Sequence, residues 1–86
     1  MEFEFDQQKS EANRLKHGIN FEEAKKLWLD VERIEIPAKN LDEPRFLIIS
    51  KLDGKYWSAI FTMRKNKIRI ISVRRARKNE IELYES

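Results

Sequence analysis

The first third of the chain carries its apolar residues at helical spacing. Residues three and four positions apart make one apolar face, formed by Phe21, Ala24, Leu27 and Trp28. This spacing predicts a helix over about residues 21–29, and Asn20 and Glu23 have the separation of a capping box. An earlier helix over residues 7–16 is predicted by Asp6, a good N-cap, and by Gly18, which is placed to end it.

The remainder of the chain alternates apolar and polar residues, which is typical of strands. Strands are predicted over residues 45–52 and 55–63 and from Ile68 onward, with an irregular strand over 31–36 and a short strand-like start at residues 2–6. The polar segment 38–44 is predicted to be a loop. Two-residue turns are predicted at Asp53-Gly54 and Lys65-Asn66, and these would join the last three strands as hairpins.

These turns predict which residues face each other and which face of the sheet each side chain occupies. The pairs are Lys51–Tyr56, Ile49–Ser58, Leu47–Ile60, Arg64–Lys67, Thr62–Arg69 and Ile60–Ile71. The main core face then holds Phe46, Ile48, Trp57, Ala59, Phe61, Met63, Ile68 and Ile70. The second face has an apolar centre of Leu47, Ile49, Ile60, Ile71 and Val73, and a polar end of Thr62, Arg64, Lys67 and Arg69.

The predicted fold class is therefore α+β. Two N-terminal helices should pack on one face of a mainly antiparallel sheet of about four strands. A C-terminal helix carrying Ile81 and Tyr84 should lie near the other face. The length of 86 residues predicts a single domain over residues 1–86.

The amino-acid composition excludes several kinds of catalytic and metal site. The chain has no cysteine, which excludes disulfides and thiolate catalysis, and its single histidine, His17, excludes a multi-histidine metal site. We therefore expect no metal and no cofactor. No stretch is apolar enough to span a bilayer and no signal-peptide pattern opens the chain, so we expect no membrane association and a cytoplasmic location.

The charge distribution says more than the formal net charge of +3. The segment 64–78 contains cations and no acid: Arg64, Lys65, Lys67, Arg69, Arg74, Arg75, Arg77 and Lys78. Guanidinium groups pair bidentately with phosphate, so this basic surface, with no acid beside it to pair with, predicts a groove for a nucleic-acid backbone. The alternative is a solvated charged sheet edge that binds no ligand.

The ordered set of motifs resembles the BrnT toxin family over nearly the whole chain. The N-terminal motif consists of Phe5, Asn13, Lys16, His17, Gly18, Ile19, Phe21, Glu22, Glu23 and Ala24. The C-terminal motif consists of Phe61, Thr62, Arg64, Ile68, Arg69, Ile70, Ile71, Ser72, Arg74, Arg75, Ala76, Glu80 and Tyr84. The chain departs from the family at Ser50, where glycine is frequent, and at Glu43-Pro44-Arg45, where proline splits an acid–arginine pair.

The resemblance implies the toxin of a type II toxin–antitoxin pair with a RelE-like ribonuclease fold. Its activity would be metal-independent endoribonuclease cleavage that inhibits translation and growth. The implied partners are RNA and a BrnA-like ribbon-helix-helix antitoxin, as a 2:2 complex. Operator DNA would be bound only through the antitoxin.

Metal-free RNA cleavage needs a base for the 2′-hydroxyl, a cation for the phosphorane and an acid for the leaving oxygen. The candidate catalytic residues are Arg64, Arg74, Arg75, His17 and Glu80, with the arginines as the cations and His17 and Glu80 for proton transfer. The candidate RNA-binding residues are Thr62, Lys67, Arg69, Arg77 and Tyr84. Structural alternatives are a helix cap for His17, an ion pair for Glu80 and packing for Tyr84.

Two other classes of function would use the same basic face. A non-catalytic nucleic-acid binder would need the cations without a proton-transfer pair. A protein-interaction module would use them to meet an acidic partner.

Overall fold

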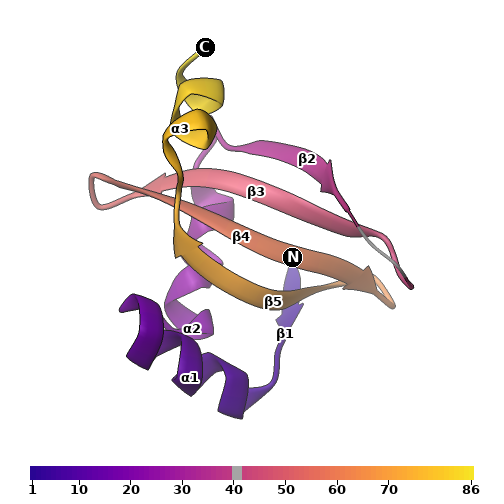
Figure 1. Cartoon of the computed structure of the whole chain (residues 1–86). Coiled ribbons are helices and arrows are strands. Elements are labelled where there is room, and N and C mark those ends of the chain that lie inside the picture. Colours follow the sequence, from indigo (N-terminus) through magenta and orange to yellow (C-terminus); the bar gives the residue numbers. More distant parts are fainter. Residues whose placement is uncertain (40–41) are drawn as a thin grey trace.

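Within residues 1–39 and 42–86, which the structure describes, the chain forms a mixed five-stranded sheet with strand order β1-β5-β4-β3-β2 (Figure 1). The structure is a computed structural model. The strands are β1 (Glu2–Glu4), β2 (Ile34–Ala38), β3 (Arg45–Leu52), β4 (Lys55–Arg64) and β5 (Lys67–Arg75). β1 runs parallel to β5, and the other neighbouring pairs are antiparallel.

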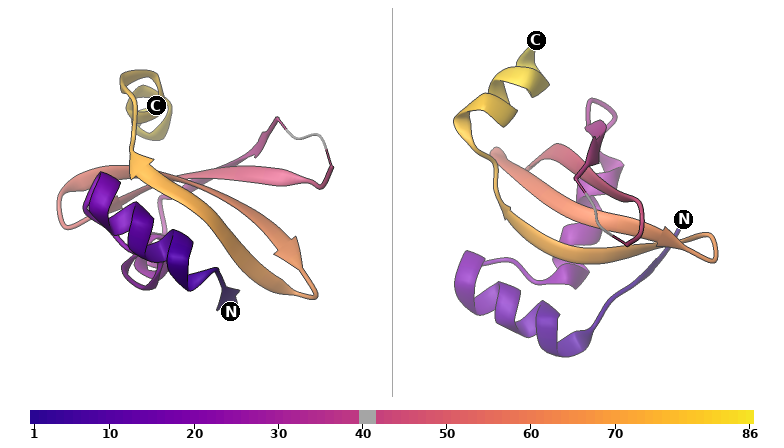
Figure 2. Two further views of the ribbon diagram at one scale, coloured as in Figure 1. Left: turned by 60° about the horizontal axis from the view of Figure 1, so that its bottom comes forward. Right: turned by 45° about the vertical axis from the view of Figure 1, so that its right-hand side comes forward.

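Helices cover the two faces of the sheet unequally (Figures 1 and 2). The N-terminal helical segments are α1 (Gln7–His17), α2 (Phe21–Ala24) and the 3₁₀ helix η1 (Lys25–Leu29), and they lie on one face. The C-terminal helix α3 (Lys78–Glu85) lies on the other face, near one end of the sheet. Much of this second face therefore has no helix over it.

The α+β class and the placement of the C-terminal helix are confirmed, with two corrections. The sheet has five strands rather than about four, because the strand-like start becomes β1 and pairs in parallel with β5. The helix predicted over residues 21–29 is an α-helix only to Ala24, and then tightens into η1. The capping box of Asn20 and Glu23 is present as predicted. Residues 40 and 41 of the predicted 38–44 loop lie outside the described residues.

Both predicted turns are confirmed by their backbone angles. Asp53 and Gly54 have φ of 51° and 79°, and Lys65 and Asn66 have φ of 49° and 67°. Positive φ at both central residues is the signature of the type I′ hairpin turn, whose twist matches that of the strands it joins.

The predicted register holds up to a β-bulge in β5. Ile60 lies opposite Ser72, and Phe61 lies opposite Ile70, so Ile71 is an extra residue without a partner. The predicted Ile60–Ile71 pair is therefore wrong. Side chains beyond the bulge change face, and Val73 lies buried in the main core rather than on the second face.

Helix α1 has little apolar surface and is attached to the sheet by buried polar groups. The Asn13 side chain accepts a hydrogen bond from the Val73 backbone N–H at 3.1 Å and donates one to the Ile19 carbonyl at 2.8 Å. Ser10 Oγ accepts a hydrogen bond from the Phe21 N–H at 2.9 Å. Buried polar groups with satisfied partners can thus place a helix that hydrophobic periodicity alone predicts weakly. In the described part of the chain, no helix is long and apolar enough to cross a membrane.

Candidate nucleic-acid interface

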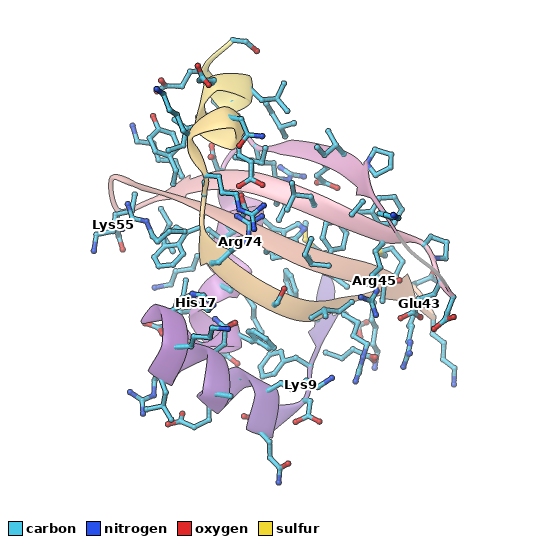
Figure 3. The ribbon with its side chains drawn as sticks, in the orientation of Figure 1. Lys9, His17, Glu43, Arg45, Lys55 and Arg74 are labelled. Carbon is cyan, nitrogen blue, oxygen red and sulfur yellow. The ribbon has the colours of Figure 1, made fainter. Side chains whose placement is uncertain are left out.

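The uncovered face of the sheet carries a group of cations at the end near the β4–β5 turn. Alternation along the strands places Arg64 and Arg69 on this face, on neighbouring strands, opposite Lys67 and Thr62 respectively. Arg45 begins β3 beside them, next to Glu43 in Figure 3. We call this group the cationic end, and it consists of Arg45, Arg64, Lys67 and Arg69.

Acidic residues from distant parts of the chain pair with the cationic end, which corrects the prediction that no acid lies beside it. Arg69 contacts Glu4 of β1 at 3.0 Å, Arg64 contacts Glu43 at 3.4 Å, and Lys67 lies 4.0 Å from Glu2. These pairs are partly or largely exposed, so each contributes little free energy. A polyphosphate strand can compete for such cations.

Thr62 is buried between these cations and uses its hydroxyl within the protein. Its Oγ1 donates a hydrogen bond to the Pro44 carbonyl at 2.6 Å, which ties the start of β3 to β4. The predicted contact of Thr62 with a phosphate oxygen would require this bond to break.

At the other end of the same face, the carboxylate of Glu80 accepts several hydrogen bonds. Glu80 of α3 is 8% exposed and accepts hydrogen bonds from Nη1 and Nη2 of Arg74, at 2.8 and 2.9 Å. It also accepts hydrogen bonds from Ser58 Oγ and from the Arg77 backbone N–H, each at 2.8 Å. Chiefly because of Arg74, the pKa of Glu80 is lowered to about 2.

Ser58 was not predicted as a site residue. The signal in the sequence was its place among the apolar residues at the centre of the second face, opposite Ile49 and two residues before Ile60. Only the tertiary fold shows that it donates a hydrogen bond to Glu80 Oε1, the same oxygen that accepts one from Arg74 Nη1.

Two of the three predicted catalytic arginines, Arg64 of β4 and Arg74 of β5, lie far apart. Arg74 is opposite Ser58, whereas Arg64 is six residues further along β4. At about 3.3 Å per residue, this separation is roughly 20 Å. Arg64 and Arg74 therefore cannot contact the same phosphate.

His17 and Arg75 lie on the opposite face from Arg74. Figure 3 shows His17 on α1, on the helix-covered side, and Arg74 on the side of α3. The Arg75 guanidinium carbon lies 5.4 Å from the centre of the Trp57 ring, and its Nε donates to the Tyr56 carbonyl at 3.3 Å. The structure thus brings Arg74 and Glu80 together and leaves the other predicted catalytic residues apart from them.

Tyr84 lies in the last turn of α3 and is held there by two contacts. Its hydroxyl donates a hydrogen bond to Asp30 Oδ2 at 2.7 Å, and its ring packs edge-on against Tyr56 at 5.4 Å. Burial and the Asp30 carboxylate raise the pKa of Tyr84 to about 12. These contacts favour the packing alternative for Tyr84. Arg77, just before α3, is exposed.

A cleft of about 260 Å³ lies on the helix-covered side, near the β3–β4 turn. Its lining is of mixed charge and consists of Gly18, Ile19, Glu23, Lys26, Leu52, Asp53, Lys55 and Trp57. No predicted site residue lines it, although His17 directly precedes Gly18. Among residues 1–39 and 42–86, no cluster of three His, Cys, Asp or Glu side chains could hold a metal ion.

An α+β domain whose uncovered sheet face presents arginines at both ends has the features of a polyanion-binding protein. Its family is given by comparison with known proteins. Residues 5–80 match the family described as the ribonuclease toxin BrnT of type II toxin–antitoxin systems, and the chain belongs to this family. None of the curated proteins compared with the chain matches it. As a family member, the chain is a toxin of the ribonuclease class that has a protein antitoxin as its partner.

Proposed function

We propose that this toxin is a metal-independent endoribonuclease that cleaves RNA and thereby inhibits translation and growth. The observation that carries the proposal is Arg74, an arginine oriented by Glu80 on the sheet face that the N-terminal helices leave uncovered. A cation held in one geometry can stabilise the charge that develops on a phosphorane without reorganising during the reaction.

The 2′-hydroxyl of RNA supplies an internal nucleophile, so the reaction can proceed without a metal-bound water. In our proposal, Arg74 contacts the scissile phosphate and the cationic end binds phosphates elsewhere along the strand. The separation of roughly 20 Å between Arg64 and Arg74 supports this division of roles.

Glu80 is better suited to positioning than to proton transfer. A carboxylate with a pKa of about 2 and hydrogen bonds from Arg74, Ser58 and the Arg77 N–H is a weak base at neutral pH. We therefore propose that Glu80 positions Arg74. We assign no proton transfer at this phosphate to His17, because His17 lies on the helix-covered side of the sheet and Arg74 lies on the side of α3.

The test compares Arg74→Ala with a matched arginine on α1. Arg14 also forms a close ion pair, with Glu11, but it is exposed on α1, on the other side of the sheet. Arg74→Ala should slow cleavage of a single-stranded RNA roughly a hundredfold, whereas Arg14→Ala should cleave at the wild-type rate.

The same assay separates the alternatives. Cleavage that continues in a metal chelator supports metal-free chemistry, and loss of cleavage in the chelator rejects it. RNA binding without any cleavage by the wild type would instead indicate a non-catalytic binder. Wild-type cleavage of the matching DNA would contradict the use of the 2′-hydroxyl.

For the partner, we propose a BrnA-like ribbon-helix-helix antitoxin in a 2:2 complex that binds operator DNA through the antitoxin. Ribbon-helix-helix proteins dimerise, and a dimer offers two equivalent toxin sites. The antitoxin would inhibit by covering the basic face. Light scattering of the purified complex should give the mass of two toxins and two antitoxins. The RelE-like fold implied by the resemblance is likewise a proposal, supported by the antiparallel strands β2–β5 with the N-terminal helices on one face and α3 on the other.

A further inference from the structure

Three exposed apolar side chains lie on α3 and on the segment hydrogen-bonded to it, at the opposite end of the sheet from the cationic end. Leu29 and Val31 are 77% and 87% exposed, and Leu83 of α3 is 42% exposed. Leu29 and Val31 flank Asp30 in the chain, and Leu83 precedes Tyr84, so the hydrogen bond between Asp30 and Tyr84 joins the two segments that carry these side chains. We call these three side chains the apolar patch.

The apolar patch is built on an ordered segment rather than on a loose loop. Asp30 Oδ2 accepts hydrogen bonds from Tyr84 Oη at 2.7 Å and from the Lys51 N–H at 2.9 Å. Asp30 Oδ1 accepts one from the Glu32 N–H at 2.9 Å, and the Asp30 carbonyl accepts one from the Arg33 N–H at 3.2 Å. Apolar groups that are both exposed and fixed in place reduce the ordering cost of binding, which is a property of protein interfaces.

The surroundings of the apolar patch are acidic. Within two positions of Leu29, Val31 and Leu83 in the chain, the acids are Asp30, Glu32, Glu82 and Glu85, and the one base is Arg33. Arg33 is paired with Glu35 at 2.9 Å, and the Lys51 ammonium lies 5.3 Å from the centre of the Tyr56 ring. Excess negative charge repels an RNA backbone and attracts a partner that carries lysine or arginine.

We propose that the apolar patch anchors the antitoxin, through a segment with apolar side chains flanked by lysine or arginine. This inference rests on the proposed toxin function and names the surface that its protein partner uses. The anchor lies next to the site without occupying it, because Leu83 is three residues after Glu80 on the helix that positions Arg74. From this anchor, the antitoxin chain can extend over the uncovered face towards the cationic end and block RNA.

The proposal is tested with single aspartate substitutions at exposed apolar positions. Val31→Asp and Leu83→Asp place a charge in the apolar patch and should weaken binding of the antitoxin encoded beside the toxin by tenfold or more. Leu15→Asp is the matched control, because Leu15 is 72% exposed but lies on α1 beyond the other face of the sheet. It should bind the antitoxin as the wild type does.

Circular dichroism should first show that the three variants are folded, and the free variants should cleave RNA at the wild-type rate. Unchanged antitoxin affinity in both patch variants would overturn the proposal, as would equal weakening in Leu15→Asp. Self-association of the free wild type that Val31→Asp abolishes would make a second toxin copy the occupant and also overturn it. If the wild type fails to cleave RNA, the proposed function fails, but the binding measurement still decides the anchor.

Discussion

The guanidinium of Arg74 holds both carboxylate oxygens of Glu80, at 2.8 and 2.9 Å, from β5 across to α3. Ser58 completes the contact from β4, so one carboxylate joins two strands and the C-terminal helix. The ion pair is mostly buried, and removing one partner of such a pair leaves the other uncompensated. Arg74 and Glu80 therefore affect both the stability of the fold and the geometry of the proposed site.

The Glu80→Gln variant tests whether Glu80 positions Arg74 or acts as the general base. Glutamine keeps the size of the side chain but loses the bidentate ion pair, so Arg74 should be held less firmly and cleavage should slow about tenfold. Because the pKa of Glu80 is about 2, its ionisation should not contribute to the pH–rate profile near neutrality. The profile of the variant should keep its shape, and loss of its acidic limb would instead indicate that Glu80 is the base.

The depressed pKa of Glu80 also predicts how stability depends on pH. The folded-state pKa is about 2, below the ordinary value of 4.5, so the stabilisation is present above pH 4.5 and is lost as pH falls toward 2. The shift corresponds to a contribution on the order of 3 kcal/mol. The melting temperature of the wild type, followed by circular dichroism from pH 5 to 2, should fall more steeply than that of Glu80→Gln. Parallel curves would contradict the low pKa.

The local features of the fold could be predicted from the sequence, because each depends on a few neighbouring residues. The Asp53-Gly54 and Lys65-Asn66 turns follow from the residues that tolerate positive φ, and they fix the pairing of Lys51 with Tyr56 and of Thr62 with Arg69. The burial of Phe61 and Ile70 follows from that pairing.

The features that were not predicted correctly depend on contacts between residues that are distant in the sequence. The acids that pair with the cationic end, Glu2, Glu4 and Glu43, lie far in the sequence from the cations that they contact. The bulge could not be predicted from the run from Ile68 to Val73. Both faces of this strand segment carry apolar side chains, so its sequence is compatible with either register. Consequently, the faces of Val73 and Arg74, and the contact of Arg74 with Ser58 and Glu80, were not predictable.

Arg64→Ala should weaken RNA binding without slowing the chemical step. Arg64 is exposed and lies roughly 20 Å along β4 from the residue opposite Arg74, so it can contact only a different phosphate. Losing one phosphate contact should reduce the slope of log affinity against log salt by about one, at unchanged kcat. A large fall in kcat with unchanged binding would place Arg64 at the reacting phosphate instead.

The bulge itself can be tested by deletion, because Ile71 is the unpaired residue of β5. Without Ile71, Ile70 would still face Phe61 and Val73 would still face Ala59, so the alternation of faces becomes regular and every other pair is kept. We therefore expect the deletion variant to fold, with Arg74 still beside Glu80.

Deletion of Val73 is the matched control, since it also removes one residue but moves Ser72 into the buried position that Val73 fills. Burying a hydroxyl in place of an isopropyl group should cost roughly 2 kcal/mol more in the free energy of unfolding. Urea denaturation of the two variants measures this difference. Equal stability of the two deletions would show that the bulge does not determine which residues face the core.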